Sequence, residues 1–180
     1  MNPRLETPRL TLRPLTLADA PDVQRLVGDW AVSRTLARVP HPYTDGMAET
    51  WIEAQSDGFD SGRAFVFALE RRNDQAFLGV VGIERNADGI YVLGYWLGRP
   101  YWGQGYMSEA APHAVRYAFE EGRIEGMIAS ALPENAASIA ILQRLGMRDE
   151  GRAVTELPAR GERREVVQFT LQREDFYANG

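Results

Sequence analysis

The 180-residue sequence contains neither cysteine nor lysine, so its basic side chains are arginines and two histidines. Without cysteine, the chain can form no disulfide, no thiolate metal site and no cysteine nucleophile. Without lysine, it can form no Schiff base, and it lacks the amine with which a P-loop binds phosphates. His41 and His113 are too isolated to indicate a metal site, and we expect none. The chemistry must therefore rely on carboxylates, hydroxyls, backbone dipoles or water.

Long apolar runs and clusters of positive charge are also missing. No apolar run approaches the ~20 residues that a helix needs to cross a bilayer, and the N-terminus lacks the apolar core of a signal peptide. The formal net charge of −5 argues against nucleic acid as a partner, because phosphate contacts need clustered cations. We expect a cytoplasmic protein without a membrane or nucleic-acid partner, in one domain over residues 1–180.

The spacing of apolar and turn-forming residues predicts an α/β fold around one mixed sheet. One predicted helix carries Trp30 on its apolar face, and the next carries Phe59. Connectors rich in Asn, Asp and Gly join three strands in the middle of the chain, which predicts antiparallel hairpins. Strands are expected near residues 10–12, 64–70, 77–84, 90–97, 126–132, 147–154 and 165–171, and helices near 16–30, 44–59, 107–121 and 135–144.

The segment Tyr101-Trp102-Gly103-Gln104-Gly105-Tyr106 lies between an apolar strand and an alanine-rich helix. Its two glycines allow the backbone to turn tightly and to approach a ligand closely. The helix that follows begins with unpaired N–H groups and with the positive end of its dipole. Together, these features predict a site for the phosphate oxygens of a pyrophosphate-bearing cofactor.

Taken alone, the glycine turn is a weak signal, and a plain strand-to-helix turn is the alternative. A Rossmann fingerprint requires a third glycine where Ser108 stands. A P-loop requires lysine where Gln104 stands, although the spacing of Gly98 and Gly103 fits one. These departures remove two of the cofactor classes that glycine turns bind.

A second segment runs from Asn135 through Ser138 to Gly146 and predicts a short helix with a polar entry and a glycine exit. Asn135 and Ser138 are three positions apart, so both side chains can lie on one edge of the helix. On its own, the segment is equally consistent with an N-cap asparagine and a helix-ending glycine.

In combination, the two segments resemble the GNAT family of acetyltransferases (GCN5-related N-acetyltransferases). In that family a pyrophosphate loop opens one helix and an Asn-x-x-Ser segment forms the next. Thr7-Pro8-Arg9-Leu10-Thr11-Leu12-Arg13-Pro14-Leu15 and Gly94-Tyr95-Trp96-Leu97 further resemble the branch that acetylates the N-termini of ribosomal proteins. The resemblance extends from Leu5 to about Leu171. It implies a mixed, mostly antiparallel sheet of about seven strands, about four helices and a V-shaped cofactor cleft.

The resemblance also implies acetyl-CoA as the cofactor, lying between the strand near 90–97 and the strand near 126–132. Backbone groups near Trp96, Leu97 and Gly98 would pair with pantetheine, and Asn135 would contact the pantetheine arm. The glycine turn would hold the pyrophosphate, with cofactor contacts from Trp102, Gly103, Gln104, Gly105, Tyr106 and Met107. The family usually carries a smaller residue at position 107, so Met107 is a departure.

An amine that attacks the bound thioester needs a base, and the departing thiolate needs an acid. The resemblance places Ser138 near the thioester sulfur, and we expect it to be the acid. Tyr95 and Tyr106 are the substitutes for Ser138 in this role.

The base cannot be transferred from the family, because the branch often carries glutamate where Val92 stands. Glu84, at the end of a predicted strand, is the candidate base, acting directly or through water. A solvated carboxylate without a catalytic role is the alternative for this residue. His41 is the other candidate base, although a histidine in a His-Pro-Tyr turn is more often structural.

The leading hypothesis is an acetyl-CoA-dependent N-acetyltransferase that acts on a protein N-terminus or a small amine, and dimers are common in the branch it resembles. An alternative is a CoA-binding regulatory module of the same fold without turnover, which Val92 and Met107 leave open. A third hypothesis, ATP binding at the glycine turn, is disfavoured by the missing lysine. Acceptor choice is expected to depend on residues 31–59 and 157–161.

Overall fold

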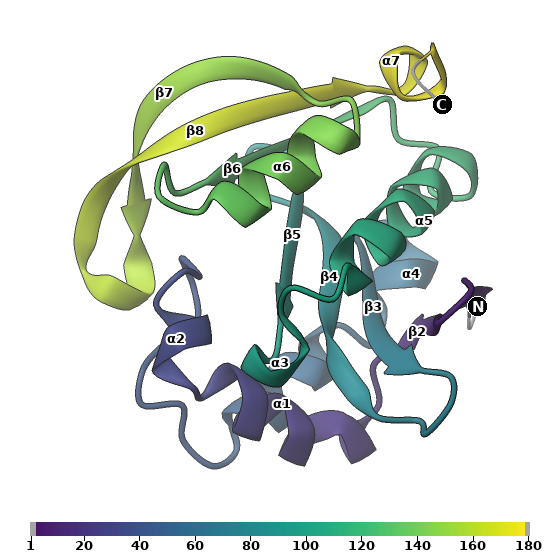
Figure 1. Ribbon diagram of the computed structural model, residues 1–180, viewed down its shortest axis with the longest axis vertical. Coiled ribbons are helices and arrows are strands. Elements are labelled where there is room, and N and C mark those ends of the chain that lie inside the picture. The colour runs from purple at the N-terminus through teal and green to yellow at the C-terminus, as the bar shows by residue number, and fades with distance from the viewer. Residues whose placement is uncertain (1–2, 179–180) are drawn as a thin grey trace.

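The computed structural model describes residues 3–178, in which helices cover both faces of one mixed sheet (Figure 1). The eight strands of this described region follow the order β1-β2-β3-β4-β5-β6-β8-β7. The strands are β1 (Leu5–Glu6), β2 (Leu10–Pro14), β3 (Ala64–Arg71), β4 (Phe77–Arg85), β5 (Tyr91–Leu97), β6 (Gly126–Ala131), β7 (Arg148–Leu157) and β8 (Glu162–Gln172). The helices are α1 (Ala20–Val27), α2 (Trp30–Ser33), α3 (Met47–Ala54), α4 (Gly58–Ser61), α5 (Tyr106–Glu120), α6 (Ala136–Arg144) and α7 (Arg173–Ala178).

The predicted α/β class and mostly antiparallel sheet are confirmed, since β5 and β6 form the one parallel pair among the described strands. β1 makes the described sheet one strand larger than expected. A turn closed by the Thr7 N–H, which donates to the Leu10 carbonyl at 2.9 Å, folds β1 back onto β2. β7 and β8 are also longer than expected and pair from Arg148 opposite Thr170 to Leu157 opposite Glu162.

The first predicted helix is divided, which corrects the expected position of Trp30. A 3-10 turn at Leu17–Asp19 leads into α1, and α1 ends at Val27. The Asp29 carboxylate then accepts a hydrogen bond from the Ala31 N–H at 2.8 Å and caps α2. Trp30 therefore begins a separate helix and is 50% exposed.

The second predicted helix is divided as well, into α3 and α4. Phe59 lies in α4, yet it still packs inward, with its ring centroid 5.0 Å from that of Phe67. These two divisions, together with α7 after β8, explain why the described helices outnumber the four or so expected.

The buried apolar residues form two cores, one on each face of the sheet. The alanine-rich side of α5 packs on one face, which we call the α5 face, and α1 and α3 pack on the other, the α1 face. Successive residues of β4 enter opposite cores: Val81 and Ile83 belong to the α5 face, and Val80 belongs to the α1 face. This alternation fixes which strand residues share a face.

β5 and β6 are paired at a single position, Val92 opposite Ile128. The two strands diverge beyond this pair, in the direction of α5 and α6, which begin after them (Figure 1). The remainder of β5, residues 93–97, keeps β4 as a partner on one side and leaves its other edge without a strand. This divergence is the expected V-shaped opening.

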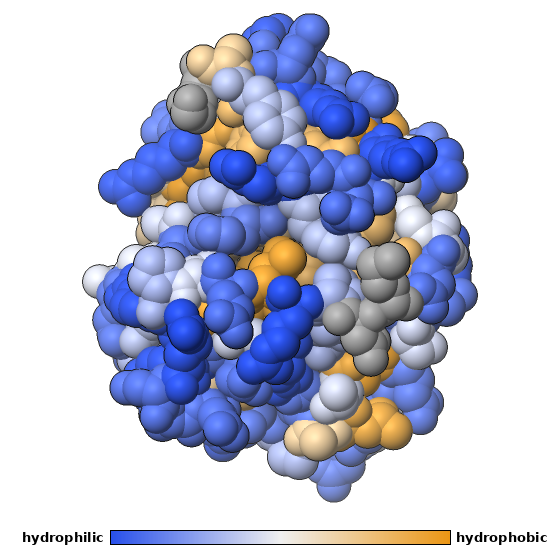
Figure 2. All heavy atoms as spheres, turned by 90° about the vertical axis from the view of Figure 1, so that its right-hand side faces the viewer, coloured by the Kyte–Doolittle hydropathy of each residue, from blue (hydrophilic) through white to orange (hydrophobic). Residues whose placement is uncertain are grey.

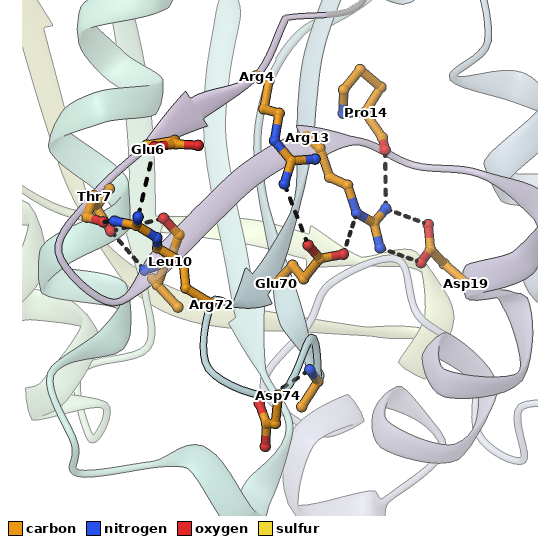
Figure 3. A network of polar contacts seen from close by, with 11 residues as sticks. Arg4, Glu6, Thr7, Leu10, Arg13, Pro14, Asp19, Glu70, Arg72 and Asp74 are labelled. Carbon is orange, nitrogen blue, oxygen red and sulfur yellow. Dashed lines mark hydrogen bonds and ion pairs between the residues drawn. The ribbon is translucent and has the colours of Figure 1, made fainter.

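A half-buried ion network fixes β2 to the start of α1 (Figure 3). The Arg13 guanidinium donates to both carboxylate oxygens of Asp19, at 2.8 and 2.9 Å, and to Glu70 of β3 at 2.8 Å. The Thr16 N–H donates to Asp19 at 2.8 Å. Burial by itself raises the pKa of Asp19, but the hydrogen bonds from Arg13 and Thr16 outweigh burial and lower it.

Figure 2 shows the face that lies on the right-hand side of Figure 1. Its surface is mostly hydrophilic, and apolar side chains show through in small areas between polar ones. Among residues 3–178, no helix combines the length and the apolar character that crossing a membrane requires.

We expect Asp19→Asn to lower the free energy of unfolding by about 3 kcal/mol, because Arg13 loses its main charge partner in a half-buried site. The folded-state pKa of Asp19 is lowered, so its ionised form stabilises the fold fully above the ordinary pKa of about 3.9. That stabilisation is lost as the pH falls through the folded-state pKa. Urea unfolding at pH 7 and pH 3 measures both effects.

Asp22→Asn is the matched control, because Asp22 forms an exposed pair with Arg25 inside α1. We expect it to change the free energy of unfolding by less than about 1 kcal/mol. Equal losses in the two variants at pH 7 would contradict the role of the network.

Candidate active site

The glycine turn predicted to bind phosphate connects β5 to α5 and is exposed. Gly103 and Gly105 have φ angles of +72° and +78°, which non-glycine residues rarely adopt. Gly105 is the N-cap of α5, and no side chain caps this helix end. The first N–H groups of α5 therefore have no partner within the helix and are suited to an anion.

Tyr106 and Met107 direct their side chains into the protein rather than toward the turn. They are 6% and 3% exposed and belong to the core on the α5 face. Burial of the Met107 side chain removes the steric objection raised by its size, because only its backbone remains at the turn. Their backbone N–H groups stand at the start of α5, as a phosphate site requires.

The end of β5 has part of its backbone already engaged. The Gly98 N–H donates to the Leu78 carbonyl at 2.8 Å, and the Leu97 carbonyl accepts from the Trp102 indole at 2.8 Å. Hydrogen-bonded and non-hydrogen-bonded pairs alternate along an antiparallel ladder, so Trp96 also directs its backbone groups toward β4. Tyr95 and Leu97 direct theirs toward the opening between β5 and β6. The Tyr95 N–H and carbonyl and the Leu97 N–H are therefore the backbone groups that an added strand could pair with, since the Leu97 carbonyl already accepts from Trp102.

Ser138 and Tyr95 meet across this opening. Ser138 lies in the first turn of α6, where its N–H donates to the N-cap side chain of Asn135 at 3.2 Å. The Tyr95 hydroxyl lies 2.9 Å from the Ser138 hydroxyl and also donates to the Ser138 carbonyl at 3.2 Å. The structure thus joins two of the three predicted acid candidates into one hydrogen-bonded pair, whereas the Tyr106 hydroxyl accepts a hydrogen bond from Arg71.

Burial raises the pKa of Tyr95 to about 12, and the hydrogen bond with Ser138 only partly opposes this rise. Tyr95 consequently keeps its proton throughout the physiological pH range. A hydroxyl that stays protonated can donate to negative charge that develops beside it.

Glu84 does not lie beside Ser138 and Tyr95. It lies directly opposite Val92 in the ladder between β4 and β5, on the α1 face, whereas Tyr95 packs on the α5 face. Burial raises the pKa of Glu84, and Arg38 opposes the rise. The residue as a whole is exposed.

The Glu84 carboxylate lies above a floor of two paired glycines. Gly82 is opposite Gly94, and one Glu84 oxygen lies 3.7 Å from the position that a β-carbon on Gly82 would occupy. A β-carbon on Gly94 would meet no atom within 4 Å, so the space above this glycine is open. Glu84 therefore occupies the strand position paired with Val92 and stands beside open space on the α1 face.

His41 is exposed and contacts Trp30, with the ring centroids 5.0 Å apart. The two regions expected to select the acceptor touch each other nearby. The Ala159 N–H donates to the Ala37 carbonyl at 3.1 Å, and the Arg160 guanidinium donates to the Ser33 carbonyl. The tip between β7 and β8 therefore rests against the segment around α2 (Figure 1).

Arg9 was not predicted as a site residue, although it lies in the segment from Thr7 to Leu15 that resembles the ribosomal-protein branch. Its guanidinium donates to the Gln104 carbonyl at 2.9 Å and to Glu109 of α5 at 2.6 Å. Only its place in the Thr-Pro-Arg-Leu motif could have indicated a role. Within residues 3–178, no cluster of three or more His, Asp or Glu side chains is arranged to hold a metal ion.

An α/β sheet that opens between two parallel strands, beside a bare helix N-terminus, has the architecture of the acyltransferases that the sequence resembles. Residues 9–148 match the family model described as the acetyltransferase (GNAT) domain, and the chain belongs to this family. It is therefore an acyltransferase by family.

The relatives confirm the resemblance to the ribosomal-protein branch. The chain is 30% identical over 175 residues to N-acetyltransferase p20 of Bacillus licheniformis, named as uncharacterized, with 96% of this chain and 97% of that protein covered. It is 29% identical over 182 residues to the ribosomal protein uS5-alanine N-acetyltransferase of Escherichia coli, with 96% and 92% covered.

Among solved structures, the chain resembles RimL, titled a ribosomal L7/L12 alpha-N-protein acetyltransferase in complex with coenzyme A. The TM-score is 0.80, with 94% of this chain and 98% of that chain covered and 19% sequence identity. At this identity the likeness concerns the fold.

We predict that the Tyr95 phenol titrates near pH 12, because burial disfavours its ionised form. Carbon-13 NMR of ring-labelled tyrosine measures this, with the Tyr95 resonance assigned by its loss in Tyr95→Phe. A midpoint below pH 10 would show that the hydroxyl is less buried than the structure indicates.

Proposed function

We propose that this protein transfers an acetyl group from acetyl-CoA to a primary amine, either a protein N-terminus or a small amine. The observation that carries the proposal is the hydroxyl pair of Tyr95 and Ser138, which lies across the opening between β5 and β6. The glycine turn and the α5 N-terminus lie at the end of the same strand.

The residues around the opening between β5 and β6 fit acetyl-CoA, the acetyl donor. The exposed turn at Gly103–Gly105 and the unpaired N–H groups of α5 suit a pyrophosphate. The outward backbone groups of Tyr95 and the Leu97 N–H suit the amides of pantetheine. Acetyl-CoA supplies an activated acetyl thioester. Asn135, as the N-cap of α6, and Ser138 stand on the opposite side of the opening.

Transfer forms a bond between the amine nitrogen and the acetyl carbon and breaks the carbon–sulfur bond. The amine gives up one proton, and the departing sulfur gains one. Ser138 and Tyr95 act together as the proton donor. The raised pKa of Tyr95 keeps the proton in place until negative charge develops at the sulfur.

Glu84 acts as the base, through water, from the α1 face. Its carboxylate stands above the glycine floor, where Gly94 leaves room for an amine to approach β5. It occupies the position on β4 that is paired with Val92 of β5. A carboxylate at Glu84 thus replaces the glutamate that the family often carries at Val92.

The acceptor is inferred from the relatives. The Escherichia coli relative is named for an alanine of ribosomal protein uS5, which favours a protein N-terminus. A panel of N-terminal peptides and of small amines tests this choice. The homodimer expectation stays a prediction, which analytical ultracentrifugation can test.

Thiol release from acetyl-CoA tests turnover directly, and the absence of cysteine means that the protein adds no thiol background. The protein also contributes no lysine amine to the assay. We expect acetyl-CoA-dependent thiol release with at least one amine in the panel. CoA binding by calorimetry without turnover on any amine would favour the regulatory module, and no CoA binding would overturn the proposal.

We predict that Ser138→Ala lowers kcat about 100-fold, the size of a general-acid contribution, while the Kd of CoA stays within about twofold. Tyr95→Phe should act similarly. The double variant should lose little more than the worse single variant, because residues that act as one unit are not additive. Steady-state kinetics and calorimetry provide these values.

Tyr177→Phe, which removes a hydroxyl from an exposed residue of α7, is the control and should leave both constants unchanged. Fully additive losses from Ser138→Ala and Tyr95→Phe would contradict a shared role.

We predict that Glu84→Gln lowers kcat/KM for the amine about 100-fold, because the amine loses its proton acceptor. Because the base must be ionised, kcat/KM should increase as the pH rises through the pKa of Glu84. This increase should be absent in Glu84→Gln. The pH profile of kcat/KM measures it. Glu174→Gln, at an exposed position in α7, is the control, and an unchanged profile in Glu84→Gln would assign the base elsewhere.

A further inference from the structure

The peptide group between Gln104 and Gly105 is held from outside the turn. Its carbonyl accepts a hydrogen bond from the Arg9 guanidinium at 2.9 Å. The Gln104 side chain is held as well, because its amide donates to the Pro100 carbonyl at 3.0 Å. A residue in an exposed turn is thus fixed at both its backbone and its side chain.

Arg9 is itself held by α5. The Glu109 carboxylate accepts from the Arg9 side chain at 2.6 Å and from the Arg9 backbone N–H at 2.8 Å. The Thr7 hydroxyl donates to the same carboxylate at 2.5 Å. The guanidinium also lies over the ring of Tyr106, 4.5 Å from its centroid. We call Thr7, Arg9 and Glu109 the N-terminal clasp.

Charge and hydrogen bonding favour this arrangement. Burial raises the pKa of Glu109, but hydrogen bonds from Thr7 and Arg9 outweigh burial and lower it, so the carboxylate is ionised at neutral pH. Planar guanidinium groups have several donors in fixed directions, and Arg9 can therefore bind Glu109 and Gln104 at the same time.

The planar geometry of the peptide bond explains how the N-terminal clasp orients the Gly105 N–H. In a planar trans peptide, the carbonyl and the N–H of one unit point in opposite directions. Because Arg9 draws the Gln104 carbonyl to its own side, the Gly105 N–H points to the other side. Without this hold, Gly105 would let the peptide group rotate at little steric cost, because that rotation changes the φ angle of Gly105.

We propose that Arg9 is a positioning residue for the cofactor. As part of the N-terminal clasp, Arg9 orients the Gly105 N–H toward the phosphates of CoA. This inference rests on the proposed function, because it takes the glycine turn as the phosphate site. A turn ordered in advance loses less conformational entropy when the ligand binds, so the clasp increases affinity.

Calorimetry with CoA tests the inference. Arg9→Gln should raise the Kd of CoA at least tenfold, about 1.4 kcal/mol. Arg9→Lys retains the charge but loses the planar set of donors, and it should bind CoA nearly as weakly as Arg9→Gln. Arg4→Gln is the matched control, because Arg4 lies in the same segment, is 57% exposed and is removed from the turn; its Kd should be unchanged.

Two further measurements separate positioning from a general loss of structure. Nitrogen-15 relaxation of Gly105 in the free protein should give a lower order parameter in Arg9→Gln and an unchanged one in Arg4→Gln. With S-acetyl-pantetheine, which lacks the phosphates, kcat/KM should be the same in Arg9→Gln as in the unaltered protein. A parallel loss with both donors would indicate a general structural defect and would overturn the positioning role.

The remaining outcomes are also decisive. Unchanged CoA binding in Arg9→Gln, or full recovery in Arg9→Lys, overturns this inference and leaves the proposed function intact. Failure of the unaltered protein to bind CoA overturns the proposed function and this inference with it.

Discussion

The divergence of β5 from β6 is the constraint on which the site depends. A sheet normally satisfies the backbone groups of an inner strand on both edges, and an unpaired edge inside a protein is unfavourable. Here the two parallel strands share one paired position, Val92 and Ile128, and then separate. The Trp102 indole satisfies the Leu97 carbonyl at the far end of this edge.

The helices that follow the diverging strands complete the site. α5 follows β5 after the glycine turn and contributes unpaired N–H groups, and α6 follows β6 after a short connection and contributes Ser138. Tyr95 links β5 to α6 by its hydrogen bond to Ser138. The turn before α5 is held by core packing of Met107 from one side and by Arg9 from the other. A flexible glycine segment thus becomes part of a rigid frame.

Several parts of this arrangement could be predicted because they are local in sequence. Gly103 and Gly105 stand next to a helix start, and Asn135 and Ser138 are one helical turn apart. Their spacing is typical of a tight turn before a helix and of one helix edge, and the phosphate role of the turn stays a prediction. The place of Glu84 could not be predicted in the same way, because its pairing with Val92 depends on the register between β4 and β5. Sequence periodicity alone also missed the break before Trp30, where the Asp29 cap starts a new helix.

By itself, the sequence determined the α/β class, the chemistry available without cysteine and lysine, and the two short motifs that carry the family resemblance. Each of these depends on residue type or on neighbours within a few positions. The tertiary structure decided which side chains meet: Tyr95 with Ser138, and Arg9 with Glu109. These partners lie 43 and 100 residues apart, and only the packing of α5 and α6 against the sheet brings their hydrogen-bonding groups within reach.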